Sequence, residues 1–136
     1  MIVDTSALMA TLIEEDGFAE IVAALRREVA RIPTPVLAEF FVVAAGRSEI
    51  HANKARLLIE MFLANGGRMV TFSLEHARAI PEARDLYGKG NGRGGKLNLL
   101  DLMVYAVAKV EDEPLLCTGR DFAATDMILH PASRTF

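Results

Sequence analysis

The chain has 136 residues and a mass of 14.8 kDa, a length that predicts one domain over residues 1–136. Hydrophobic residues make up 51% and charged residues 24%, a balance that excludes a disordered chain and is typical of a globular protein. The net charge of −3 excludes binding of nucleic acid by bulk positive charge, so a polyanionic substrate would require a local basic patch or a bound cation.

The first half of the chain predicts one short strand and four helices. An apolar, β-prone run opens the sequence and ends at Asp4. Thr34 and Pro35 combine a capping hydroxyl with a proline at the first helical position, the pattern of a helix start. The expected elements are, in order, a strand over 1–4 and helices over 7–13, 18–29, 35–46 and 50–64.

The second half alternates strands and helices. Residues 88–96 read GKGNGRGGK, and their glycines predict a flexible loop. Strands that alternate with helices favour an α/β fold, a small parallel β-sheet covered by helices. Such sheets bind ligands outside the carboxyl ends of their strands. The expected elements are a strand over 69–72, a helix over 73–87, a helix over 98–110, a strand over 115–118 and an edge strand over 127–129.

Nothing in the sequence indicates export or a membrane span. The longest apolar stretch lies between Arg31 and Arg47, is interrupted by Glu39, and falls short of the ~20 residues that a span needs. The first basic residue is Arg26, whereas a secretory signal opens with a basic segment. A single cysteine, Cys117, excludes an internal disulfide and argues against a structural zinc site. We therefore expect a cytoplasmic protein.

Four carboxylates lie within or directly against apolar sequence: Asp4, Glu39, Asp101 and Asp121. Each has an ordinary structural explanation as well. Asp4 could cap a helix, Asp101 could form a capping box with Asn98, and Asp121 could serve a turn. Glu39 falls in the second turn of its helix, beyond capping range, so its structural alternative is a pair with an arginine.

The four acids would repel one another if they converged at the strand ends. Two charges ~5 Å apart at an effective dielectric constant of ~20 interact by roughly 3 kcal/mol. Protons or cations would have to neutralise such a cluster. Carboxylate oxygens from several elements suit Mg²⁺ or Mn²⁺, and an acidic site of this kind is typical of metal-assisted phosphoryl chemistry.

Four short motifs match those of a known protein family and follow one another along the chain in the same order. They are residues 1–8 (MIVDTSAL), 34–39 (TPVLAE), 97–101 with 105–109 (LNLLD and YAVAK), and 118–122 with 125–126 (TGRDF and TD). With these motifs the chain resembles a PIN-domain ribonuclease, and more narrowly a VapC-type toxin of a VapBC toxin–antitoxin system. The resemblance spans nearly the whole chain.

The resemblance implies a PIN-like fold with helices on both sides of the sheet and an endoribonuclease that needs Mg²⁺ or Mn²⁺. Asp4, Asp101 and Asp121 would hold the ion, and Glu39 would bind through water or orient the attacking water. Cleavage would leave a 5′-phosphate and a 3′-hydroxyl. The resemblance also implies an RNA substrate, homodimerisation and inhibition by a VapB-type antitoxin. Asp126 is a further candidate acid.

Five other residues are candidates for substrate contact. Thr5 and Ser6 could orient Asp4 or the scissile phosphate, or simply cap the helix. Three basic residues of the glycine-rich loop offer phosphate contacts, or serve only its solubility: Lys89, Arg93 and Lys96.

The chain departs at three places from the pattern of the family that it resembles. Leu100 stands where glycine is common, residues 91–95 replace a His-Pro-Ala segment, and Arg120 stands where a small polar or acidic residue is common. Arg120 could pair with an acid or touch a phosphate.

Other interpretations stay open at this stage. The helices over 18–29 and 50–64 are read mainly as core, with an antitoxin or dimer surface as the alternative. A PIN-type nuclease of RNA processing or repair would carry the same acids. A non-catalytic Mg²⁺-binding α/β module, such as a receiver domain of a signalling protein, is a further alternative. A receiver domain has paired acids after its first strand and a lysine after its last strand, whereas this chain has a lone Asp4 and no such lysine. An inactive PIN scaffold would not be expected to keep all four acids.

Overall fold

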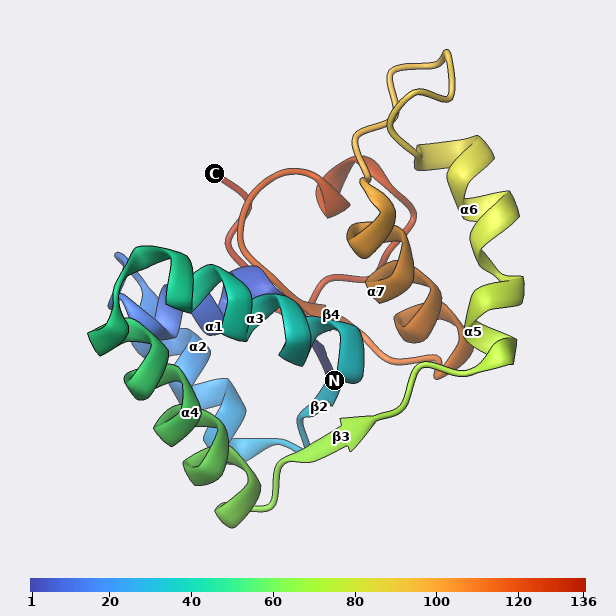
Figure 1. Ribbon diagram of the computed structural model, residues 1–136. Helices are drawn as coiled ribbons and strands as arrows, with labels where there is room; N and C mark the ends of the chain where they lie inside the picture. The colour runs from blue at the N-terminus through green and yellow to red at the C-terminus, as the bar shows by residue number, and fades with distance from the viewer.

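Four short strands form one parallel sheet at the centre of the molecule (Figure 1). The computed structural model describes residues 1–136. The spatial order of the strands is β3-β2-β1-β4, so β1 is flanked on both sides and consists only of buried apolar residues. The strands are β1 (Ile2–Val3), β2 (Arg31–Pro33), β3 (Arg68–Val70) and β4 (Leu115–Leu116).

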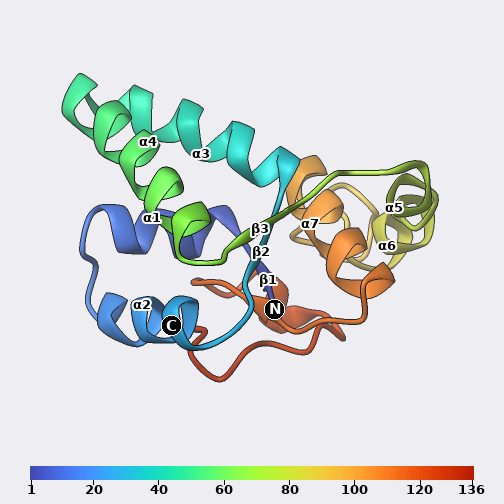
Figure 2. The same ribbon diagram turned by 90° about the horizontal axis from the view of Figure 1, so that it is seen from below.

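Helices cover both sides of this sheet. In the two perpendicular views, α1 to α4 lie on one side of the strands and α5 to α7 on the other (Figures 1 and 2). This confirms the expected α/β architecture. The helices are α1 (Thr5–Leu12), α2 (Phe18–Arg27), α3 (Thr34–Arg47), α4 (Glu49–Ala64), α5 (Leu74–Arg78), α6 (Ile80–Tyr87), α7 (Leu99–Val110) and the 3₁₀ turn η1 (Phe122–Ala124).

Three elements differ from the sequence expectation. The strand β2 was not expected, because three residues that include an arginine and a proline carry no strand pattern of their own. The expected helix over 73–87 is two helices, α5 and α6, that meet at Ala79, and Pro81 lies in the first turn of α6. The expected strand over 127–129 is reduced to one bridge between Leu129 and Leu115.

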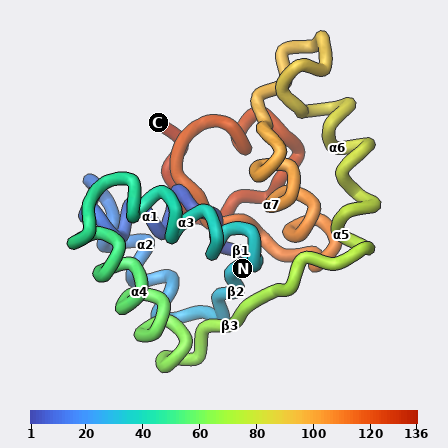
Figure 3. Tube along the Cα trace, in the orientation of Figure 1, coloured from blue at the N-terminus to red at the C-terminus, as the bar shows by residue number.

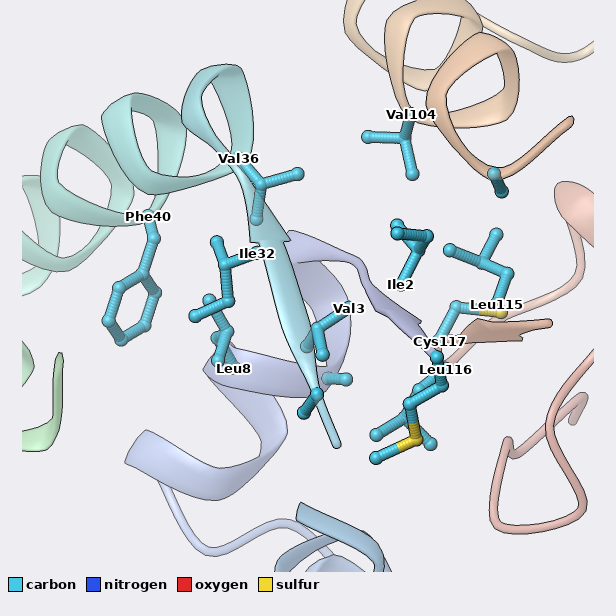
Figure 4. Packing of buried hydrophobic residues seen from close by; sticks show 14 of the residues in the cluster. Ile2, Val3, Leu8, Ile32, Val36, Phe40, Val104, Leu115, Leu116 and Cys117 are labelled. Atoms are coloured by element: carbon cyan, nitrogen blue, oxygen red, sulfur yellow. The ribbon is translucent and has the colours of Figure 1, made fainter. Parts of the chain in front are cut away.

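The hydrophobic core lies where the sheet meets α1, α3 and α7. Figure 4 shows Leu8 and Phe40 lying beside Ile32 of β2, and Val104 lying next to Ile2 of β1. All five side chains are inaccessible to solvent. Because this core fixes the three helices against the strands, it also fixes the helix starts at the carboxyl edge of the sheet. No helix of the chain has both the length and the apolar character that a membrane crossing requires.

A network of ion pairs occupies the opposite, amino edge of the sheet. Arg31, at the start of β2, pairs with Glu111 and Glu113, and Glu113 also binds the N-terminal ammonium at 2.6 Å. The buried His76 contacts Glu111 through Nε2 at 2.9 Å. The two acids at this edge therefore each have cationic partners in the protein.

Candidate active site

Asp4 is the first acid at the carboxyl edge, directly after β1. It caps α1, because its Oδ2 accepts hydrogen bonds from the Ser6 backbone N–H at 3.0 Å and the Ser6 hydroxyl at 2.5 Å. Only 7% of Asp4 is exposed. Burial raises the pKa of Asp4, the bonds from Ser6 counteract this, and the charge of Glu39 raises it further. The capping alternative is therefore correct, and it coexists with a carboxylate that faces another acid.

Glu39 lies one turn into α3 and points toward the same edge. Its Oε2 accepts a 2.5 Å hydrogen bond from the hydroxyl of Thr5, the first residue of α1. No arginine pairs with Glu39, so the alternative of a buried ion pair is not what the structure contains. The contact orients Glu39 without neutralising it.

Asp101 lies in the first turn of α7 and forms the capping box expected with Asn98. Its Oδ2 accepts from the Asn98 N–H at 3.0 Å, and the Asn98 Oδ1 accepts from the Asp101 N–H at 2.9 Å. The pKa of Asp101 is raised to about 6, first by burial and then by the charges of three other acids, while the Asn98 N–H lowers it. Those three acids are Asp4, Asp121 and Glu39.

Asp121 is the most exposed of the four acids and lies immediately before η1. It lines a hollow of about 390 Å³ together with Asp101. Figure 1 shows η1 beside the start of α7, which places the two acids on neighbouring elements. Asp121 therefore belongs to the same site as Asp101, because its charge raises the pKa of Asp101 and both acids line one hollow.

The structure thus brings the four sequence-predicted acids into one electrostatic cluster. None of the four takes part in an ion pair, in contrast to the acids of the amino edge. No three of the chain's acidic, histidine or cysteine side chains are close enough together to form a ready-made metal site. The donors are carboxylate oxygens alone, which suit hard cations such as Mg²⁺ and Mn²⁺.

Ser6 connects two strand ends within this site. Its hydroxyl donates to Asp4 and accepts from the Thr118 backbone N–H, just after β4, at 2.9 Å. Thr5 and Ser6 therefore both act on acids of the cluster as well as starting α1.

The glycine-rich loop over 88–96 lies next to the acids. Figure 3 shows it projecting beyond the end of α6 and the start of α7. Lys89 and Lys96 line the hollow that contains Asp101 and Asp121, and Arg93 lines an adjoining hollow of about 150 Å³ that also includes Asp121. None of these three cations forms an ion pair with the chain's own acids.

A family model described as the PIN domain matches residues 1–127. The chain belongs to the PIN-domain family. Among curated relatives, ribonuclease VapC36 of Mycobacterium tuberculosis is 38% identical over 130 residues, which cover 93% of this chain and 91% of that protein. At this identity and coverage, the chain also belongs to the VapC ribonucleases.

Two solved structures have the same fold at low sequence identity. VapBC2 from Rickettsia felis, bound to a DNA fragment from the promoter, has a TM-score of 0.73 at 18% identity and covers 95% of this chain and 96% of its own. The M. tuberculosis toxin VapC20, described as cleaving the sarcin-ricin loop, has a TM-score of 0.73 at 16% identity, with coverages of 93% and 95%. PIN-domain VapC ribonucleases are in general metal-dependent.

Two side chains of this PIN domain lie differently from the sequence interpretation. Asp126 does not enter the acid cluster, because its carboxylate accepts from the Tyr105 hydroxyl at 2.6 Å and from Lys109 at 3.0 Å. Arg120 is exposed and forms no ion pair with an acid of the chain. Asp126 therefore fastens the segment that follows Asp121 instead of serving as a fifth acid.

Sequence reasoning missed two residues that shape this PIN-domain site. Asn91, within the glycine-rich loop, hydrogen-bonds three backbone groups. An Asn between two glycines is a turn pattern and could have indicated this role. Tyr105 lies in an apolar helix, and no sequence pattern connects its hydroxyl with Asp126, which is 21 positions away.

Proposed function

We propose that this chain is a metal-dependent endoribonuclease, the toxin of a VapBC-type toxin–antitoxin pair, which hydrolyses RNA phosphodiester bonds. The observation that carries the proposal is the group of four mutually repelling acids without a cationic partner in the protein. An edge that concentrates negative charge in this way suits a divalent cation and the phosphoryl chemistry that it assists. Membership of the VapC ribonucleases supports RNA as the substrate. The cytoplasm is the proposed place of action.

Asp4, Asp101 and Asp121 are the proposed ligands of Mg²⁺ or Mn²⁺. The hydrogen bonds that cap the two helices go to one oxygen of Asp4 and to one oxygen of Asp101, which leaves the second oxygen of each as the proposed metal ligand. Without a cation the carboxylates repel one another, so we expect them to close around an ion when it binds. A bound ion would supply a water molecule of lowered pKa and would stabilise charge on the phosphate.

The remaining groups orient the reactants. Glu39, held by the hydroxyl of Thr5, directs the attacking water by accepting a hydrogen bond from it. Ser6 holds Asp4 and the end of β4 in one arrangement. In-line attack on phosphorus breaks the bond to the 3′ oxygen, which leaves a 5′-phosphate and a 3′-hydroxyl.

Lys89, Arg93 and Lys96 are the proposed phosphate contacts beside the acids. They supply local positive charge on a chain whose net charge is −3. Charge reversal of Arg93 and Lys96 together should weaken RNA binding and flatten its dependence on salt. An unchanged salt slope would exclude the loop as a contact.

An apolar groove between α2 and α4 is the proposed site for a helix of the antitoxin. It has a volume of about 360 Å³ and is lined mainly by hydrophobic side chains, including Phe18, Val22, Leu58 and Met61. An amphipathic helix can bury its apolar face in such a groove. A basic side chain of the same antitoxin could then neutralise the acid cluster. We also propose a homodimer, as the family resemblance implies.

Incubation of the purified protein with a mixed RNA pool tests this function. We expect cleavage with Mg²⁺ or Mn²⁺, none with EDTA, and none by Asp4→Asn or Asp101→Asn. Folded, antitoxin-free protein that leaves every RNA intact, or cleavage that survives in EDTA, would contradict the proposal. The choice between the two metals follows from their relative rates.

A further inference from the structure

One side chain, Asn91, organises the glycine-rich loop. Its Oδ1 accepts hydrogen bonds from the backbone N–H of Arg93 at 2.8 Å and of Gly95 at 3.1 Å. Its Nδ2 donates to the carbonyl of Asp85, near the end of α6, at 3.1 Å. The amide therefore ties both ends of the Arg93–Gly95 segment to the preceding helix.

The base of the loop is closed by backbone contacts. Leu97 accepts from the Lys89 N–H at 2.7 Å and donates to the Tyr87 carbonyl at 3.0 Å. Gly95 packs against this base, since a Cβ atom added there would lie 2.2 Å from the Gly88 carbonyl oxygen. The loop thus has a defined shape that depends on the side-chain bonds of Asn91 and on Gly95 at its base.

This shape presents Arg93 to the acid cluster. Arg93 lines the hollow that contains Asp121, and no acid of the protein pairs with its guanidinium. Its neighbours Gly92 and Gly94 have φ angles of +77° and +79°, a backbone conformation that glycine adopts without strain. A segment this rich in glycine would sample many conformations if it had no internal hydrogen bonds, and Arg93 would then have no fixed position.

We propose that Asn91 is a positioning residue for RNA, which holds Arg93 so that its guanidinium contacts a backbone phosphate beside the acids. The inference rests on the proposed ribonuclease function. Asn91 lowers the entropy cost of binding because it orders the loop before RNA arrives. The guanidinium is suited to this contact because its planar donors match two phosphate oxygens.

The test is Asn91→Ala, measured for binding and for catalysis. Binding uses a fluorescein-labelled single-stranded RNA of mixed sequence in EDTA, and cleavage uses the same RNA with Mg²⁺. We expect Kd and KM to rise about ten-fold, and the salt slope of binding to fall by roughly 0.7, with kcat unchanged. The melting temperature should stay constant, because Asn91 lies outside the hydrophobic core.

A double-mutant cycle separates positioning from a general effect on the loop. If Asn91 acts through Arg93, then Arg93→Ala should weaken binding as much as Asn91→Ala does, and the double variant no further. Effects that add in the double variant would overturn the inference. Gly95→Ala should weaken binding as Asn91→Ala does, whereas the control Gly46→Ala should not, because no atom lies within 4 Å of the added Cβ.

The failure of this inference differs from failure of the ribonuclease proposal. Wild-type protein that neither binds nor cleaves RNA would overturn both. Wild-type protein that cleaves RNA through Asp101, together with an Asn91→Ala variant of equal Kd and KM, would overturn the positioning role alone.

Discussion

Two sets of interactions have opposite effects on the charge of Asp101. The capping box with Asn98 favours the carboxylate, whereas burial and three neighbouring acids favour the protonated form. Burial and repulsion prevail, because the pKa rises to about 6 from an ordinary value of 3.8. A divalent cation would reverse this balance, so the protonation of Asp101 should be coupled to metal binding.

We predict that Asp101→Asn stabilises the metal-free protein at neutral pH. The folded protein binds the Asp101 proton more tightly than the unfolded chain, so stability falls as pH rises from 3.8 to about 6. Asparagine keeps the oxygen that accepts from Asn98 but has no charge. In EDTA its melting temperature should exceed that of wild type at neutral pH and equal it below the ordinary Asp pKa.

Added Mg²⁺ serves as the control for that prediction. It should raise the melting temperature of the wild-type protein at neutral pH and leave that of Asp101→Asn unchanged. A variant that is less stable than wild type in EDTA at neutral pH would show that Asp101 does not experience the repulsion described above.

The bond from Thr5 to Glu39 predicts an effect on catalysis rather than on folding. Thr5→Val preserves the shape of the side chain but removes the hydroxyl that orients Glu39. Without this bond Glu39 is no longer held in one orientation toward the attacking water, and such a loss of positioning costs on the order of ten-fold or more, so kcat should fall at least ten-fold. Steady-state cleavage kinetics measure this effect. An unchanged kcat would show that the Thr5 hydroxyl does not orient Glu39 for catalysis.

The four acids could be identified from sequence because each interrupts or directly follows apolar residues. Their partners could not be identified in the same way. The Thr5–Glu39 contact spans 34 positions and depends on how α1 meets α3, a geometry that tertiary packing sets. Asp126 looked like a further acid because its type and position suited the site, but Tyr105 and Lys109 lie on the adjacent face of α7 and bind it.

At the level of elements, the segment that bears Asp121 is held by a cluster around Asp126. The Asp126 carboxylate accepts from Tyr105 and Lys109 of α7, and its N–H donates to the Tyr87 hydroxyl at 3.3 Å. The pKa of Tyr105 is raised, first by burial and then by Asp126, so its hydroxyl remains a donor at every working pH.

Tyr105→Phe should therefore loosen the Asp121 segment. We expect a loss of about 1 kcal/mol in the free energy of unfolding, because the buried Tyr105 loses its charge-assisted bond to Asp126, which is itself exposed to solvent. We also expect weaker binding of Mn²⁺, because Asp121 loses its support. Denaturant unfolding and calorimetry give the two quantities, and Mn²⁺ affinity equal to that of wild type would show that this cluster serves stability alone.

The groove between α2 and α4 predicts a separation of inhibition from activity. Met61 lines the groove, and 53% of it is exposed, so Met61→Glu should leave the fold intact. The variant should bind the co-expressed cognate antitoxin at least ten-fold more weakly and still cleave RNA. The matched control is Leu63→Glu on the same helix, 46% exposed and outside the groove, which should retain the antitoxin. Equal retention by both variants would place the antitoxin elsewhere.

The elements were predictable where local sequence decides them. The starts of α3 and α7 follow from Pro35 and from Asn98, whose effects are confined to a single turn. The strand β2 could not be predicted, because its pairing with β1 and β3 makes it a strand and its own composition does not. Ala79 marks a break between α5 and α6 that Pro81 could have indicated.

At the level of the whole molecule, the parallel sheet separates two kinds of charge. The amino edge holds Glu111 and Glu113 against Arg31, and the bond with His76 is the first cause that lowers the pKa of Glu111. The carboxyl edge holds four acids with no cationic partner. Because all strands run in one direction, their carboxyl ends share one edge, and the chain concentrates its uncompensated charge there.

Calorimetric titration of the RNA-free protein with Mn²⁺ shows whether this edge of the sheet is a cation site. Wild type and the control Asp112→Asn, an exposed position beyond the far end of α7, should bind Mn²⁺ alike at neutral pH. Asp4→Asn and Asp101→Asn should each weaken binding at least ten-fold, and acidification below about pH 6 should weaken it in wild type. Mn²⁺ affinity that is the same in all four proteins would contradict the assignment of these acids as the metal site.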